Sequence, residues 1–390
     1  MARLDAAQLQ ALKHRGDGVA DSIADQYLDH LEQPSKFFRA TIAARYSLPD
    51  LMDDDVRNFL QQNPPPLPEW AAQARLRNGA EFFKEWGIQL GLGLFLQALP
   101  LAYASEEGVK VLALTSKLEK DTSRRVMESA QFVLDVTTPG ALAPGQVGYD
   151  TARHIRLMHA GIRQLIRDDP RIPITTDPTV ENRWDPQWGQ PINQLHMLGA
   201  MLSYSSSLLH VLDLLGADYS EDGAADYCLL WNAVGWLLGV DETLLPLERH
   251  EMVELETAIQ RMTHGTSTEG KLMTDSLIEL VQGYIKIPGF KGLPITLMRL
   301  FIGDDVAELL GVPKAGWTRV LIRAKHGLGH GASRGSTGLR RRAVGWASSK
   351  ILRGFVAHNR GPDRPKYTIP DHLELKVGRN PGKRRTTSLR

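Results

Sequence analysis

Apolar residues recur along most of the chain at the spacing of helices. Between clusters of proline and glycine they return every three or four residues, whereas the strict alternation that indicates strands is scarce. The helical pattern covers residues 121–136, a stretch that begins near Tyr149, residues 196–215, 227–238 and 244–262, and a run after residue 289 that ends at Leu310. We therefore predict an all-α protein.

Proline and glycine clusters mark where these helical segments end. The prolines at 64–68 close an N-terminal helical region, and a loop is expected over 137–148. Five prolines within 168–191 leave no room for a regular helix there. The sequence Gly-Val-Pro at 311–313 ends the last helical run.

Charge separates the end of the chain from the rest. The whole chain has a formal net charge of +1, but residues 314–390 contain 19 Lys and Arg against 3 Asp and Glu, which leaves a net charge of −15 before them. We predict three parts: an N-terminal helical segment at 1–65, one large helical domain at 66–313, and a basic, partly irregular C-terminal extension at 314–390.

Residues 86–104 form the most apolar window of the sequence. Their length approaches that of a membrane helix, but Pro100 and three glycines interrupt the window, and no basic cluster flanks one end. We predict a buried core helix.

The beginning of the sequence lacks the basic and apolar regions of an export signal, so we expect a cytoplasmic protein. The single cysteine, Cys228, excludes an intramolecular disulfide and a cysteine-cluster metal site within the chain. We expect Cys228, His196, His210, Trp231 and Trp236 to lie in the core.

Three partial motifs fail on spacing or residue type. His250 and Glu251 begin a zincin pattern, but Glu254 stands where the second His is required. Residues 378–383 resemble a phosphate loop that is one residue too short, and the glycine-rich run at 327–331 has no preceding strand. We expect neither metalloprotease nor nucleotide-binding chemistry.

Two neighbouring helices carry the most informative polar residues. On helix 121–136, Arg125 and Ser129 lie one turn apart at the edge of an apolar stripe; on the next helix, His159 falls inside an apolar stripe that we expect to be buried. The stripes consist of Val126, Ala130, Val133 and Leu134 on the first helix and of Ile155, Ile162 and Ile166 on the second. Antiparallel packing would leave a slot for a planar cofactor such as haem, whose iron takes a His from one helix. The alternative is a core histidine with an internal hydrogen-bond partner.

Four segments carry a resemblance to a known family. They are RRVMESAQFVLDV at 124–136, TARHIRLMHAGIR at 151–163, PINQLHMLGAMLSYS at 191–205 and WNAVGWLLGV at 231–240. In order and approximate spacing, across residues 120–313, the sequence resembles the MpaB-type oxygenases and the bacterial latex clearing proteins, which are rubber oxygenases.

The resemblance implies a globin-like helical core that holds haem b, with His159 as the iron ligand. In latex clearing proteins the facing helix carries an Arg, a Lys three residues later and a Thr one further on; the matching positions here are Arg125, Glu128 and Ser129. A Lys amine can shield or ligate iron, whereas a Glu accepts a proton or an ion pair, so the distal chemistry is expected to differ. Rubber-cleaving members are exported, whereas we expect this protein to be cytoplasmic. Polyisoprene is therefore not the expected substrate.

We accordingly expect a haem-dependent oxygenase that combines dioxygen with a small apolar substrate, such as an isoprenoid or a lipid. Arg125 would orient oxygen by hydrogen bonding, Glu128 would move protons, and Ser129 would position a water or a substrate group. Arg153 and Arg156 could each pair with a haem propionate, or form a solvated helix face.

Two other classes of protein stay open. One is a non-catalytic α-helical module that binds haem or an apolar ligand in the same slot. The other is a scaffold whose basic extension contacts an anionic membrane surface or, as the less expected partner, nucleic acid. We do not expect nucleic acid as a partner, because the extension offers few aromatic side chains for stacking on bases.

Overall fold

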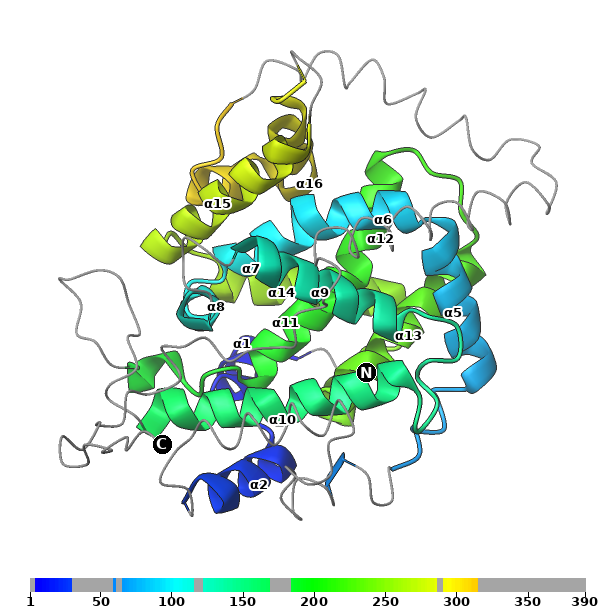
Figure 1. Cartoon of the computed structure of the whole chain (residues 1–390), viewed down its shortest axis with the longest axis vertical. Helices are drawn as coiled ribbons and strands as arrows, with labels where there is room; N and C mark the ends of the chain where they lie inside the picture. The colour runs from blue at the N-terminus through cyan, green and yellow to red at the C-terminus, as the bar shows by residue number, and fades with distance from the viewer. Residues whose placement is uncertain are drawn as a thin grey trace, which may run out of the picture.

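The computed structural model describes residues 4–29, 59–60, 65–115, 122–168, 184–285 and 290–314. The basic extension predicted after residue 314 lies outside the described residues. Secondary structure in the described part is helical, apart from one isolated bridge between Ser105 and His264 (Figure 1). The prediction of an all-α protein is confirmed.

Figure 1 labels the α-helices of the described residues. In chain order, the helices of all types are α1 (Ala6–Leu12), α2 (Gly18–Asp29), α5 (Gln73–Glu85), α6 (Gly87–Gly93), the π-helix η2 (Leu94–Ala98), α7 (Leu99–Ala104), α8 (Gly108–Thr115), α9 (Thr122–Val136), α10 (Val147–Asp168), the 3₁₀ helix η3 (Pro186–Trp188), α11 (Gln194–Tyr204), α12 (Ser206–Leu214), α13 (Glu221–Leu237), the 3₁₀ helix η4 (Glu242–Leu244), α14 (Arg249–Thr263), α15 (Thr268–Tyr284) and α16 (Leu293–Leu309).

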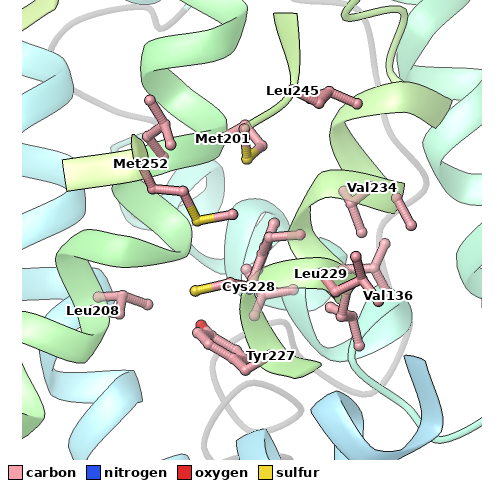
Figure 2. Packing of buried hydrophobic residues seen from close by; sticks show 14 of the residues in the cluster. Val136, Met201, Leu208, Tyr227, Cys228, Leu229, Val234, Leu245 and Met252 are labelled. Atoms are coloured by element: carbon pink, nitrogen blue, oxygen red, sulfur yellow. The ribbon is translucent and has the colours of Figure 1, made fainter. Parts of the chain in front are cut away.

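Helix α13 lies at the centre of the largest apolar core. It packs against α5, α10 and α11, and its residues from Tyr227 to Gly235 are all buried. A helix that is apolar all round is suited to such a position. Figure 2 shows Tyr227, Cys228 and Leu229 of this helix among side chains of the surrounding helices. The contact with α5 is close, because a Cβ at Gly79 would lie 2.3 Å from the carbonyl oxygen of Asp226.

The apolar window predicted as a core helix is observed as α6, η2 and α7 in direct succession. Residues Gly87–Ala104 are long and apolar enough to cross a membrane, and 67% of this window is buried inside the protein. Pro100 is accommodated in the first turn of α7, where a missing backbone N–H costs little. The burial fits the predicted core helix.

The helix predicted over 196–215 is interrupted. Helix α11 ends and α12 begins at Ser205, whose backbone leaves the helical region at φ −110° and ψ −89°. The buried Ser205 hydroxyl donates to the carbonyl oxygens of Met201 and Leu202, at 3.2 and 3.3 Å. Such local hydrogen bonds let a serine compete with the helical backbone, and periodicity alone does not reveal them.

The predicted core residues divide into three groups. Trp231 and Cys228 are buried as expected, whereas Trp236 and His196 are only half-buried. The prediction for His210 is wrong, because this side chain is exposed. It lies on the side of α12 opposite the buried residues Leu208, Leu209, Val211 and Leu212, a direction that the dense apolar run obscures.

A buried carboxyl group joins α14 to the start of α12. Glu256 is 8% exposed, and its carboxylate accepts hydrogen bonds from the hydroxyls of Ser206 and Ser207 and, at 3.1 Å, from the amide of Gln260. Burial raises the pKa of Glu256 to about 7, although these three hydrogen bonds act to lower it. Because the folded state holds this proton more tightly than the unfolded state, the group links folding to pH.

Glu256→Gln is expected to change the pH dependence of stability. Between pH 4.5 and about 7 the unfolded chain releases the Glu256 proton while the folded chain keeps it, so this group makes the wild type less stable as pH rises. A shift of this size corresponds to roughly 3 kcal/mol. Urea unfolding at pH 4.5 and pH 8 should show the variant gaining about this much relative to wild type at the higher pH. The exposed neighbour Glu254→Gln is the control, and equal pH profiles for all three proteins would contradict the prediction.

Candidate functional site between α9 and α10

Helices α9 and α10 form the pair that the sequence predicted, and the loop between them is tightly defined. Helix α10 begins at Val147, two residues earlier than expected. The Thr137 hydroxyl donates to the carbonyl oxygen of Val133 at 2.6 Å, and the Tyr149 N–H donates to that of Ala141 at 2.9 Å. A Cβ at Gly148 would lie 2.8 Å from the carbonyl oxygen of Asp135, so the two helices approach closely at this end. Figure 1 shows them as neighbours in the fold.

Helix α9 presents a half-buried face with polar groups. Its stripe residues Val126, Val133 and Leu134 are buried as predicted, and Ala130 is half-buried. Glu128 and Ser129 are half-buried, as is Phe132 one turn after Glu128. Arg125 belongs to α9 at the register position one turn before Ser129. The predicted distal residues therefore occupy neighbouring positions on one side of α9.

The prediction for α10 is only partly correct. Of the expected buried stripe, Ile166 is buried, but Ile155, His159 and Ile162 are half-buried. Met158 is half-buried on the same side, so these residues form a continuous stripe, which we call the α10 stripe and define as Ile155, Met158, His159 and Ile162. Periodicity identifies an apolar face, but it does not show whether the protein itself covers that face fully.

The two histidines of the TARHIRLMHA segment differ in position. His154 is 7% exposed, and its Nδ1 atom lies 2.6 Å from the carbonyl oxygen of Asp150 within α10. His159 is half-buried on the α10 stripe, and its Nδ1 atom is buried. His159 is therefore the histidine that an apolar group lying on the α10 stripe would meet.

Arg156 and Arg163 join α10 to the start of α2. Arg156 binds both carboxylate oxygens of Asp17, with Nη2 to Oδ1 at 2.8 Å, and Arg163 pairs with Asp21. We call these four residues the α2 clamp. Burial raises the pKa of Asp21 and lowers that of Arg163, while the opposite charges counteract both shifts. The apolar periodicity could not predict the α2 clamp, because the paired residues lie 139 residues apart for Asp17 and Arg156 and 142 residues apart for Asp21 and Arg163.

Arg153 also has partners within the protein. It is 6% exposed, donates to the carbonyl oxygens of Phe59 and Leu60, and lies over the Phe59 ring at 5.0 Å. The alternative of a solvated helix face is thus wrong for both Arg153 and Arg156. Their pairing with haem propionates stays a prediction, and the contacts observed here engage both guanidinium groups without it.

A second buried ionic cluster contains the half-buried His196. Lys13 Nζ lies 2.8 Å from Glu107 Oε1, and His196 Nε2 lies 3.8 Å from Glu107 Oε2. Although burial opposes the effect, the neighbouring His196 and Lys13 side chains lower the pKa of Glu107 to about 2. The half-buried position of His196 is thus explained by its place in an ionic cluster with Glu107 and Lys13.

The donor chemistry is compatible with haem. In the described part of the chain, no group of three or more His, Cys, Asp or Glu side chains is arranged to hold a bare metal ion. A haem iron needs only one protein ligand, because the porphyrin supplies the other four nitrogens. One imidazole on an incompletely covered apolar stripe is therefore a suitable donor set for this group.

Comparisons with known proteins point to one family. Residues 81–334 match the family described as ER-bound oxygenase mpaB/B'/rubber oxygenase, catalytic domain. A rubber oxygenase from Streptomyces sp. (strain K30) is 23% identical over 312 residues, which cover 76% of this chain and 71% of that protein. The solved structure of a latex clearing protein in the closed state superimposes with a TM-score of 0.69 at 20% identity, over 88% of this chain and 91% of the other.

The region that matches the family, residues 81–334, includes α9, α10 and every later described helix up to α16. The structural similarity also accounts for the all-α architecture. The chain belongs to the mpaB and rubber oxygenase catalytic-domain family.

Proposed function

We propose that this protein is a haem b-dependent oxygenase that acts on an apolar substrate and holds the haem iron through His159. The observation that carries the proposal is the α10 stripe, where an imidazole lies among three apolar side chains that the described protein covers only in part. Membership of an oxygenase family supports the same chemistry.

The residues of the site divide into two roles. His159, with Ile155, Met158 and Ile162, would form the proximal wall, where apolar side chains pack against a porphyrin and exclude water. A haem bound there would supply the redox-active iron that oxygenase chemistry requires. The α9 residues Glu128 and Ser129 would contribute polar groups on the facing side.

The α9 residues supply distinct functions in this proposal. Arg125 provides a permanent cation that orients dioxygen by hydrogen bonding. Glu128 accepts and returns a proton at a carboxylate oxygen, and Ser129 holds a water or a polar group of the substrate with its hydroxyl. Glu128 stands where latex clearing proteins carry a Lys, so the proton chemistry on this side would differ from theirs.

Oxygen consumption by the purified, haem-supplemented protein tests the proposed reaction. We expect uptake that depends on an added apolar alkene, with squalene, β-carotene and linoleic acid as probes, and incorporation of ¹⁸O from labelled dioxygen into the product. Haem binding without substrate-dependent uptake for any probe would contradict the oxygenase proposal and support a binding module.

A further inference from the structure

Aromatic side chains form a series, in two parts, that runs from the candidate site to the protein surface. It begins at Phe132, one turn after Glu128 on the half-buried face of α9. The Phe132 and Trp231 ring centroids are 6.5 Å apart, and Trp231 stacks on Tyr204 at 5.0 Å with an interplanar angle of 20°. The first part of the chain thus leads from α9 into the core around α13.

The second part leads from α13 outward. Tyr227 lies one turn before Trp231 on α13, and its hydroxyl donates to the carbonyl oxygen of Tyr204 at 2.7 Å. The Phe82 ring lies 5.5 Å from that of Tyr227 and 5.7 Å from that of Tyr219. Tyr219 is half-buried, so the chain ends where solutes can approach it.

Trp231 and Tyr219, one in each part of this series, differ in whether a nearby group can accept their proton. The indole Nε1 of Trp231 is buried without a carboxylate acceptor in the described part of the protein, so an oxidised Trp231 would keep its proton. The Tyr219 hydroxyl donates to the carboxylate of Asp213, which can accept a proton when the phenol loses an electron. Tyr227 has only a backbone carbonyl as its acceptor, which is a far weaker base.

We propose that Trp231 and Tyr219 are stations of an electron relay that carries oxidising equivalents from the α9 side of the site to the surface. In the first step, a one-electron oxidant of the peroxide-derived class takes one electron from Trp231. Trp231 then regains an electron from Tyr219, whose phenolic proton moves to Asp213. A soluble thiolate then gives one electron to the Tyr219 radical and becomes a thiyl radical, which combines with a second thiyl radical to form a disulfide, and Asp213 returns the proton to the phenolate oxygen. The relay thereby spares the site from oxidative damage.

The relay rests on the proposed function only for the source of the oxidant. It can therefore be tested without haem by attaching a ruthenium photosensitiser to a Cys introduced by Gln131→Cys, next to Phe132 on α9. Cys228 is buried, which favours selective labelling at the new site. After a flash, the full-length protein should form a tyrosyl radical, detected by transient absorption and by electron paramagnetic resonance.

Each variant has a defined expected result. Tyr219→Phe should abolish the tyrosyl signal and leave a longer-lived tryptophan radical. Trp231→Phe should remove both signals, and Asp213→Asn, which leaves the core unchanged, should slow tyrosyl formation. Tyr284→Phe, outside the chain of rings, should behave as wild type. A tyrosyl signal that is unchanged in Tyr219→Phe and Trp231→Phe would overturn the relay.

A second arm uses the haem-supplemented protein and hydrogen peroxide, with the same radical signals as the readout. If the photosensitiser drives the relay but peroxide does not, the relay stands and the placement of the haem fails. If neither oxidant yields a radical at Tyr219, the relay itself is wrong.

Discussion

Replacing Asp17 by Asn is expected to lower the free energy of unfolding by about 3 kcal/mol. The change would leave the Arg156 guanidinium, whose side chain is 20% exposed, without the carboxylate that binds it through two hydrogen bonds. Gly239 tightens this arrangement, since a Cβ there would lie 2.1 Å from Asp17 Oδ2. Urea unfolding monitored by circular dichroism measures the loss.

A surface ion pair supplies the matched control for the α2 clamp. Arg15 is 51% exposed and pairs with Asp241, so Arg15→Gln should cost less than about 1 kcal/mol. Removing both charges in Asp17→Asn with Arg156→Gln should restore part of the loss, because no charge is then left buried alone. An Asp17→Asn protein as stable as Arg15→Gln would show that the clamp contributes little.

The second large effect is expected on catalysis. Glu128→Gln should reduce kcat by roughly 10²-fold or more, since the amide keeps the shape of the side chain but cannot carry a proton. Glu128→Asp should retain part of the activity and shift the pH profile. The measurement is initial dioxygen uptake with a probe that supports turnover in the wild type.

Two observations keep this test specific. The haem spectrum of Glu128→Gln should match that of wild type, which separates a proton-transfer defect from a loss of cofactor. Glu279→Gln, at an exposed carboxylate of α15, should leave uptake unchanged. Wild-type kcat in Glu128→Gln would remove Glu128 from the proton path.

Local signals in the sequence were sufficient to predict the helical pair that carries the candidate site. The breakers in 137–148 and the apolar spacing on both sides predict α9 and α10 to within two residues. The break at Ser205 was missed because it depends on hydroxyl hydrogen bonds inside a continuous apolar run.

The site was only partly predictable for a different reason. The position of His159 on an apolar face follows from periodicity, but its half-burial depends on which other helices cover α10. The α2 clamp occupies the side of α10 that carries Arg156 and Arg163, and Asp17, which directly precedes α2, lies 139 residues before its partner Arg156 in the sequence. Such distant pairs leave no local pattern.

The structural similarity to a latex clearing protein supports the assignment of the fold more than it supports the assignment of a reaction. At 20% identity the latex clearing protein shares the helical architecture. On the resemblance described above, Glu128 takes the position of a Lys in latex clearing proteins, which is why the experiments on this residue test whether the proposed site differs from theirs.

The most direct test of the proposed haem site is the absorption spectrum of protein expressed with added haem precursor, for wild type, His159→Ala and His154→Ala. We predict a Soret band in the wild type and in His154→Ala, and loss or displacement of that band in His159→Ala alone. Identical spectra for wild type and His159→Ala would contradict His159 as the iron ligand, and a wild type without any Soret band would contradict haem as the cofactor.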